Sequence, residues 1–320
     1  MVISSGFHSL GKSPSTPFHP LTTMFRTILL LGFVLFLTHD LTAQKGEARR
    51  QIAKIIQSSN AKVGVSVLGL EDRDTLAFDG KGHYPMQSVY KFPLAVAVLH
   101  EVDRGKLSLD MKIHVRKKDL LPDTWSPMRD KYPKGEIHLT LSEILRYTVS
   151  QSDNNGCDIL FRMLGGPAKV EAYIRSLGIT GMAFAATEEE MHERPKTQFS
   201  NWCEPEAMVK LLDMFHGGRI LSESSRKFLW NAMAETSTGP DRIKGLLPPG
   251  TTVAHKTGSS GRNSEGTIHA LNDVGIVVLP KNRHVAIVVY VSDSHEDNDT
   301  LENVIARISK IVWDYFSAKK

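Results

Sequence analysis

The sequence predicts an α/β protein of the α+β type, with an antiparallel sheet flanked by helices and a separate all-helical domain. Strand-like runs rich in β-branched residues occur near both chain ends, over residues 62–70 and 252–291. Apolar residues at helical spacing dominate the part between them. Helical stripes also precede the first strand and follow the last one. The simplest arrangement is one sheet built from both chain ends and covered by the terminal helices.

Composition and charge exclude several kinds of protein. The chain has 320 residues, is 41% hydrophobic and 23% charged, and therefore has a globular composition. Its formal charge is +4, of which residues 1–43 carry +1, so the rest is too weakly basic to predict nucleic-acid binding. No H-E-x-x-H or calcium-loop spacing occurs, so neither a metal nor a cofactor is expected. Cys157 and Cys203 could form one disulfide, and the sequence leaves their pairing open.

Residues 1–43 have the pattern of a signal segment. Arg26 precedes the apolar run 28–37, which is too short to span a bilayer, and Ala43 stands before the polar Gln44. A cut after Ala43 predicts a periplasmic or secreted protein without stable membrane insertion. An uncut anchor is the alternative, and Met24 is an alternative start.

The folded part is expected to contain two domains. The α/β domain is discontinuous and takes residues 44–84 and 236–320, with helices at 47–58 and 300–316 and strands at 62–70, 75–78, 252–256, 273–279 and 284–291. The helical domain takes residues 85–235, with helices at 94–102, 142–149, 157–164 and 206–215 and a cap expected near Ser142. Short connections favour antiparallel pairing, and a cleft is expected between the domains.

The first chemical motif is Ser88-Val-Tyr-Lys91, at the head of an apolar helix. A serine hydroxyl needs a base to become a nucleophile, and residues three apart share one helix face. The same spacing starts at Ser9, Ser59, Ser224 and Ser317, where it indicates only solvated surface. Ser88 differs because it follows a strand hairpin and opens an apolar helix.

Two further motifs occur once each. Ser152-Asp-Asn154 is typical of a loop and helix cap, but Ser152 could relay a proton and Asn154 could hold a substrate carbonyl. Lys256-Thr-Gly258 ends a strand, where Lys256 and Thr257 could bind a carboxylate. Gly258 and the small Ser259 would allow close approach of an extended substrate.

The three motifs together, in this order, resemble those of the penicillin-recognising serine enzymes, and among them the class A β-lactamases. The resemblance covers nearly the whole chain after residue 43. It implies a β-lactamase/transpeptidase-like fold and hydrolysis of penicillins or cephalosporins through a serine acyl-enzyme, which gives antibiotic resistance. It also implies an oxyanion hole formed by the backbone N–H groups of Ser88 and Ser259.

The resemblance further implies an omega loop, about residues 186–204, whose glutamate directs water at the acyl-enzyme. Glu188 is assigned this role, and Glu189 or Glu190 are the alternative bases. The purely structural alternative is that residues 188–190 form a solvated acidic face. His192 stands four residues later, where an asparagine is usual, and Asn201 stands where an acid usually closes the loop. These departures resemble the divergent subclass A2 branch of extended-spectrum cephalosporinases.

Three peripheral assignments also come from the resemblance. Trp125 would form an aromatic wall beside the cleft, or be a half-buried loop aromatic. Arg242 would hold the substrate carboxylate, or be a surface charge, and His192 would contact substrate.

Two other functions would also fit parts of this pattern. A penicillin-binding D,D-peptidase is the main rival, and a catalytically silent cell-wall-binding module is another. The expected partner is a small β-lactam, and the expected state is a monomer.

Overall fold

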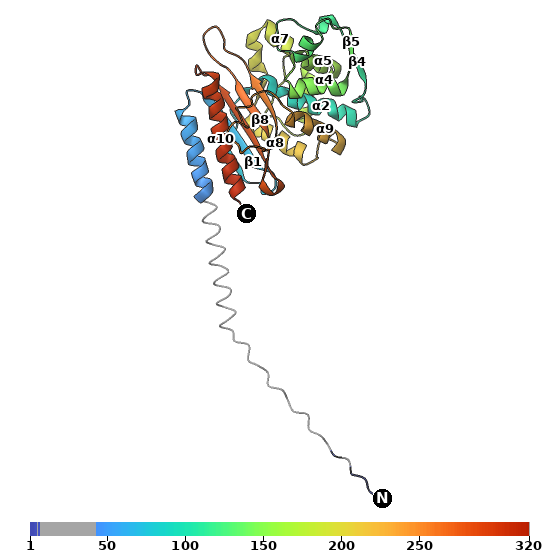
Figure 1. Ribbon diagram of the computed structural model, residues 1–320, viewed down its shortest axis with the longest axis vertical. Helices are drawn as coiled ribbons and strands as arrows, with labels where there is room; N and C mark the ends of the chain where they lie inside the picture. The colour runs from blue at the N-terminus through green and yellow to red at the C-terminus, as the bar shows by residue number, and fades with distance from the viewer. Residues whose placement is uncertain (5, 7–42, 320) are drawn as a thin grey trace. The chain divides into compact units, whose positions relative to one another are not determined.

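The computed structural model describes residues 1–4, 6 and 43–319 (Figure 1). It divides into two compact units, Met1–Gly46 and Glu47–Lys320, and the second contains every feature discussed below. Most of the predicted signal segment lies outside the described residues. Within the described part, no helix combines the length and apolar character needed to cross a bilayer.

A five-stranded antiparallel sheet organises the unit, in the order β2-β1-β9-β8-β7. Its strands are β1 (Lys62–Gly69), β2 (Thr75–Phe78), β7 (Val253–Ser259), β8 (Leu271–Leu279) and β9 (Arg283–Ser292). The first and last parts of the chain meet where β1 pairs with β9, for example Val67 opposite Ile287. The predicted sheet from both chain ends is therefore confirmed.

Two terminal helices cover one face of this sheet. The helix before β1, over residues 47–58 of this unit, lies beside α10 (Asn298–Ala318) in Figure 1. Ile52, Ile55, Leu301 and Ile305 lie in the same buried cluster as alternate residues of β1 and β9. The apolar stripes predicted from helical spacing thus meet the apolar side of the pleated sheet.

The opposite face carries the larger core and the helical block. Its helices are α2 (Lys91–Asp103), α3 (Pro127–Lys131), α4 (Leu141–Ser150), α5 (Asn154–Leu164), α6 (Pro167–Ser176), α7 (Glu188–Glu193), α8 (Pro205–His216) and α9 (Glu223–Ala234). Helix α2 lies at the centre, in contact with α4, α5, α6 and α9, and buries all of residues 91–99. A helix surrounded by others must be apolar on every face, as residues 92–99 of this helix are.

Two details of the helical block differ from the prediction. The cap of α4 is Thr140 and not Ser142, because Thr140 Oγ1 accepts the Glu143 N–H while the Glu143 carboxylate accepts the Thr140 N–H. Two short strand pairs were also missed: β3 (Tyr84–Pro85) with β6 (Trp202–Cys203), and β4 (Lys112–Val115) with β5 (Ile137–Thr140). Strands β3 and β6 have only two residues each, and β4 and β5 lie within a stretch whose apolar spacing is otherwise mostly helical, so an alternating pattern did not reveal them.

The two cysteines are separate buried thiols. Burial raises the pKa of both, so each stays protonated and acts as a small apolar side chain within the core. The fold around them is therefore maintained by packing without a disulfide between Cys157 and Cys203.

Candidate active site

A hollow brings together nearly all the residues that the sequence predicted for the site. Its lining includes Ser88, Trp125, Ser152, Asn154, Glu188, His192, Arg242, Thr257 and Ser259. Lys91 and Lys256 are fully buried and contact this lining through their amino groups. Segments that lie far apart in the sequence therefore meet in one place.

The nucleophile candidate stands on a tight turn at the start of α2. Ser88 lies in the 3₁₀ turn Gln87–Tyr90, which runs directly into α2 at Lys91. With three residues per turn, positions three apart lie one above the other, so Lys91 Nζ comes within 2.9 Å of Ser88 Oγ. Gln87 adopts a left-handed φ of 47°, which is uncommon for a residue other than glycine. Strain of this kind commonly marks functional sites.

The Lys91 amino group has four oxygen neighbours. Besides Ser88 Oγ, it lies 2.8 Å from the Ser152 carbonyl oxygen and 2.9 Å from Glu188 Oε1, and it donates to Asn154 Oδ1. An ammonium has three N–H groups, so it cannot donate to all four oxygens at once. Glu188 Oε1 is buried and accepts no directed hydrogen bond from the described residues. Protons can therefore move among these groups without a large change in geometry.

The Ser152 segment is a strained loop fixed by the cap of α5. Ser152 has a left-handed φ of 58°. Next to it, Asp153 accepts hydrogen bonds from Gly156 N at 2.8 Å and Met128 N at 2.7 Å. The structural alternative, an N-cap, is thus correct for Asp153, and the cap holds Ser152 Oγ where it meets Lys256.

Strand β7 supplies the second buried lysine. Lys256 Nζ donates to Ser152 Oγ and to the Thr257 carbonyl oxygen, both at 2.9 Å. Burial, together with the charge of Lys91, holds the pKa of Lys256 well below its usual value. The Thr257 hydroxyl lies 2.5 Å from the Thr238 hydroxyl, a lining residue that the sequence did not suggest.

Gly258 has a different contact from the one expected. A Cβ at this position would lie 2.6 Å from the Met86 carbonyl oxygen. The glycine therefore lets β7 approach the chain just before Ser88, in addition to any close approach by substrate.

The omega loop presents Glu188 at the first turn of α7. Thr187 caps this helix, and Glu190 accepts the Thr187 N–H at 2.9 Å, so the Glu190 carboxylate is used in the cap. Glu188 is only 9% exposed and is the member of the triplet that reaches Lys91. A solvated acidic face is therefore wrong for Glu188.

Two buried side chains hold this loop in place. Asp158 on α5 accepts the backbone N–H groups of Glu188 and Glu189 at 2.8 and 2.9 Å. Asn201 accepts from Ala185 N and Ala186 N and donates to the Ala186 carbonyl oxygen, so it closes the loop as expected. Asp158 was missed, because an acid inside an apolar helix pattern gives no sign of what it will face.

The three peripheral residues differ in exposure. Trp125 is 60% exposed and its indole N–H donates to the Gln151 carbonyl oxygen, while His192 is exposed at the rim of the hollow. Arg242 is only 7% exposed, so the alternative of a surface charge is wrong. Its guanidinium donates to the carbonyl oxygens of Gly258 and Asn272 and to Glu302, which leaves fewer N–H groups for a ligand.

We expect the Asp158 carboxyl to give stability an unusual pH dependence. Burial and the nearby Glu188 raise its pKa to about 7. The folded chain then binds a proton that the unfolded chain releases near pH ~4, so the free energy of unfolding falls as pH rises from about 4 to 7. Urea unfolding across this range, compared with Asp158→Asn, should isolate a component on the order of a few kcal/mol. Parallel pH profiles of the two proteins would contradict this assignment.

Comparisons with known proteins agree with this geometry. A family model described as the β-lactamase enzyme family matches residues 47–316. The β-lactamase VEB-1 of Pseudomonas aeruginosa is 43% identical over 296 residues, covering 92% of this chain and 98% of its own. The chain belongs to the β-lactamase enzyme family. The expected hydrolysis of β-lactams is thereby confirmed.

Solved structures confirm the fold of this β-lactamase. The crystal structure of the TLA-1 extended-spectrum β-lactamase is 54% identical with a TM-score of 0.83, covering 85% of this chain and 99% of its own. A class A β-lactamase from Bacteroides cellulosilyticus is 40% identical with a TM-score of 0.83, covering 86% and 99%. This β-lactamase is thus of class A, similar to the A2 branch that its motifs resemble.

Proposed function

We propose that this β-lactamase hydrolyses penicillins and cephalosporins through a serine acyl-enzyme, as a hydrolase acting on cyclic amides. The observation that carries the proposal is the position of Lys91 Nζ, 2.9 Å from both Ser88 Oγ and Glu188 Oε1. The serine hydroxyl contacts the lysine amine, and the amine contacts the carboxylate. A hydroxyl nucleophile is activated by groups arranged in this way.

Acylation begins when Ser88 Oγ attacks the lactam carbonyl. The Ser88 proton passes to Lys91 in its amine form, and Glu188 remains a carboxylate during this step, so that it is available as a base afterwards. The direct contact with Lys91 favours this route over one through water to Glu188. In the amine form, two N–H groups remain for the Ser152 and Asn154 oxygens, and the lone pair faces Ser88.

The oxyanion and the leaving nitrogen are served by two other groups. The backbone N–H groups of Ser88 and Ser259, at the hollow, stabilise the developing negative charge. Ser152 passes a proton to the leaving nitrogen and is re-supplied by Lys256, whose lowered pKa makes its ammonium a better donor.

Deacylation uses Glu188 as the general base for water. Its Oε1 accepts no directed hydrogen bond among the described residues, and it shares the contact with Lys91 and the lining of the hollow with Ser88. Asp158 holds the backbone of Glu188 so that the carboxylate keeps this orientation. Both halves of the reaction therefore use the same small set of proton carriers.

Substrate binding is assigned to the rim of the hollow. Asn154 holds the substrate amide, and Thr257 with Lys256 and Arg242 attracts its carboxylate. Trp125 and His192, which both line the hollow, contact substituents of the β-lactam. The named relative TLA-1 is an extended-spectrum enzyme, which supports cephalosporins as substrates here.

The chain is further proposed to act as an exported, periplasmic or secreted monomer after cleavage of residues 1–43.

One assay separates this function from its rivals. With a chromogenic cephalosporin, the proposed hydrolase gives many turnovers per enzyme. A penicillin-binding D,D-peptidase gives one stoichiometric burst followed by slow release, and a silent cell-wall-binding module gives no colour change. A single burst without further turnover would overturn the proposal.

A further inference from the structure

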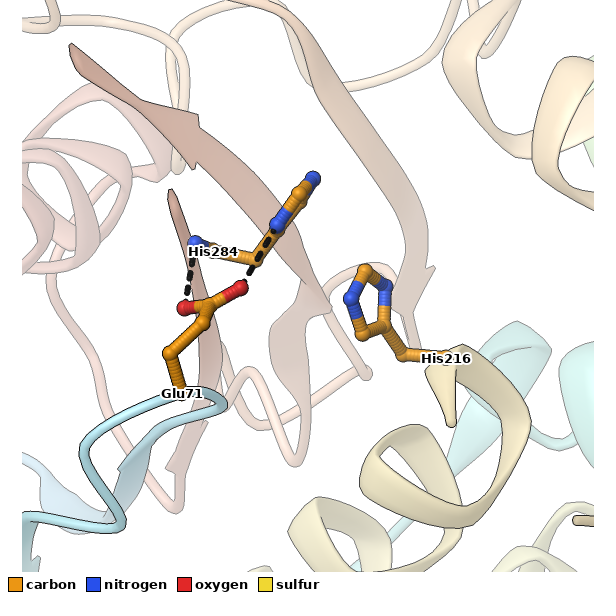
Figure 2. Close-up of side chains that lie close together, drawn as sticks. All are labelled: Glu71, His216 and His284. Atoms are coloured by element: carbon orange, nitrogen blue, oxygen red, sulfur yellow. Dashed lines mark hydrogen bonds and ion pairs between the residues drawn. The ribbon is translucent and has the colours of Figure 1, made fainter. Parts of the chain in front are cut away.

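A group of three potential metal ligands lies away from the catalytic hollow. Glu71, His216 and His284 each place one ligand atom so that all three lie within 4.8 Å of one another. None of them lines the hollow around Ser88. Figure 2 shows the ring of His216 turned toward His284 and Glu71.

The fold brings these residues together from three segments. Glu71 lies in the turn between β1 and β2, where Leu70 N donates to the His284 carbonyl oxygen at 3.0 Å. His284 is near the start of β9, and its N–H donates to Glu71 Oε2 at 2.8 Å. His216 is the last residue of α8, which packs on β1 and β9. A turn, a strand and a helix end therefore bring the three side chains together.

The geometry of the group is close to that of an ion site. His284 Nδ1 lies 2.9 Å from Glu71 Oε1, and the two histidine rings have centroids 4.4 Å apart. Ligands bound at about 2.1 Å lie roughly 3.4 Å apart in a tetrahedral site. The widest separation, at most 4.8 Å, would have to close by about 1.4 Å, and side-chain rotation at a turn and at a helix end can supply this.

We propose that Glu71, His216 and His284 form a binding site for a divalent transition-metal ion such as Zn²⁺. Two imidazoles and one carboxylate are ligands that Zn²⁺ prefers, whereas Mg²⁺ and Ca²⁺ prefer oxygen ligands alone. The Glu71 side chain is 44% exposed, and a hollow lined by His216, His284 and Trp230 adjoins the site, so an ion and a water ligand can enter.

Binding would replace the hydrogen bond between His284 and Glu71 with bonds to the ion. The proton of the neutral His284 ring would be carried on Nε2, by exchange through solvent, and His284 Nδ1 and Glu71 Oε1 would become ligands with one nitrogen of His216. The negative charge of Glu71 attracts the ion and offsets part of its charge. Arg226 and Lys227, which line the adjoining hollow, are positive and oppose this attraction. The ion would join the sheet to α8, so its expected effect is on stability and not on turnover.

The test is a Zn²⁺ titration of the untagged metal-free protein against a competing chromophoric chelator. We expect one bound equivalent, with affinity lowered about tenfold or more by His216→Asn and by His284→Gln. His114→Asn is the matched control, because His114 also pairs with a glutamate, at 2.9 Å from Glu136, and stacks on another histidine. That variant should bind like the unchanged protein.

A second measurement does not depend on how well the histidine variants fold. Zn²⁺ at a hundred times its dissociation constant should raise the unfolding temperature of the unchanged protein by roughly 5 °C, with no effect from Mg²⁺. Glu71→Gln should reduce this rise, and cephalosporin turnover should stay unchanged. Absence of a bound equivalent, or equal loss of binding in His114→Asn, would overturn the proposal.

Discussion

Ser88→Ala is expected to lower kcat for a chromogenic cephalosporin by about 10⁶-fold, while the protein keeps its fold. The reason is that Ser88 Oγ is the group that Lys91 contacts at 2.9 Å, and alanine removes the atom that would form the acyl bond. Steady-state hydrolysis measures the loss, and mass spectrometry after incubation should find no covalent adduct.

Ser224→Ala provides the matched control for this change. Ser224 begins another S-x-x-K spacing, with Lys227, but it is exposed on α9. Its replacement should leave turnover within a factor of two or so, as for surface changes in general. Comparable losses in the two variants, or near-normal turnover by Ser88→Ala, would mean that the nucleophile lies elsewhere.

Glu188→Gln is expected to trap the acyl-enzyme. Glutamine keeps the size of the side chain beside Lys91 but cannot accept a proton from water, so release should slow by about 10²–10⁴-fold. The chromogenic cephalosporin should then give a burst of one equivalent, and mass spectrometry should detect the substrate fragment on the protein.

The neighbouring Glu189→Gln serves as its control. It removes the same charge one residue away, where the backbone N–H also binds Asp158, and turnover should be preserved. Steady cephalosporin turnover by Glu188→Gln would falsify the role of Glu188 in deacylation. Failure to form any adduct would instead assign acylation to Glu188 and contradict the direct route through Lys91.

Much of the site could be predicted because its chemistry depends on short motifs. Ser88 and Lys91 share a helix face through their spacing, so local geometry alone positions them. Local sequence could not distinguish the functional glutamate within residues 188–190, since all three are identical in type. Tertiary structure distinguishes them, because only Glu188 turns toward Lys91 while Glu190 completes the cap at Thr187.

Residues whose partners lie far away in the chain were beyond prediction. Asp158 binds a loop thirty positions later, and Gly258 fits against Met86 because β7 passes there. Glu71, His216 and His284 lack any metal-binding spacing, yet a turn, a helix end and a strand bring them together. Whether Cys157 and Cys203 form a disulfide could not be predicted for the same reason. The structure shows that they are buried as two separate thiols.

The sequence by itself determined the α+β class, the sheet formed from both chain ends, and the three motifs that carry the chemistry. These depend on periodicity and on neighbouring residues, both of which are local properties. Only the tertiary structure decided which glutamate, which capping groups and which buried acid complete the site. Those choices depend on distance in space and on burial, which arise once distant segments have packed together.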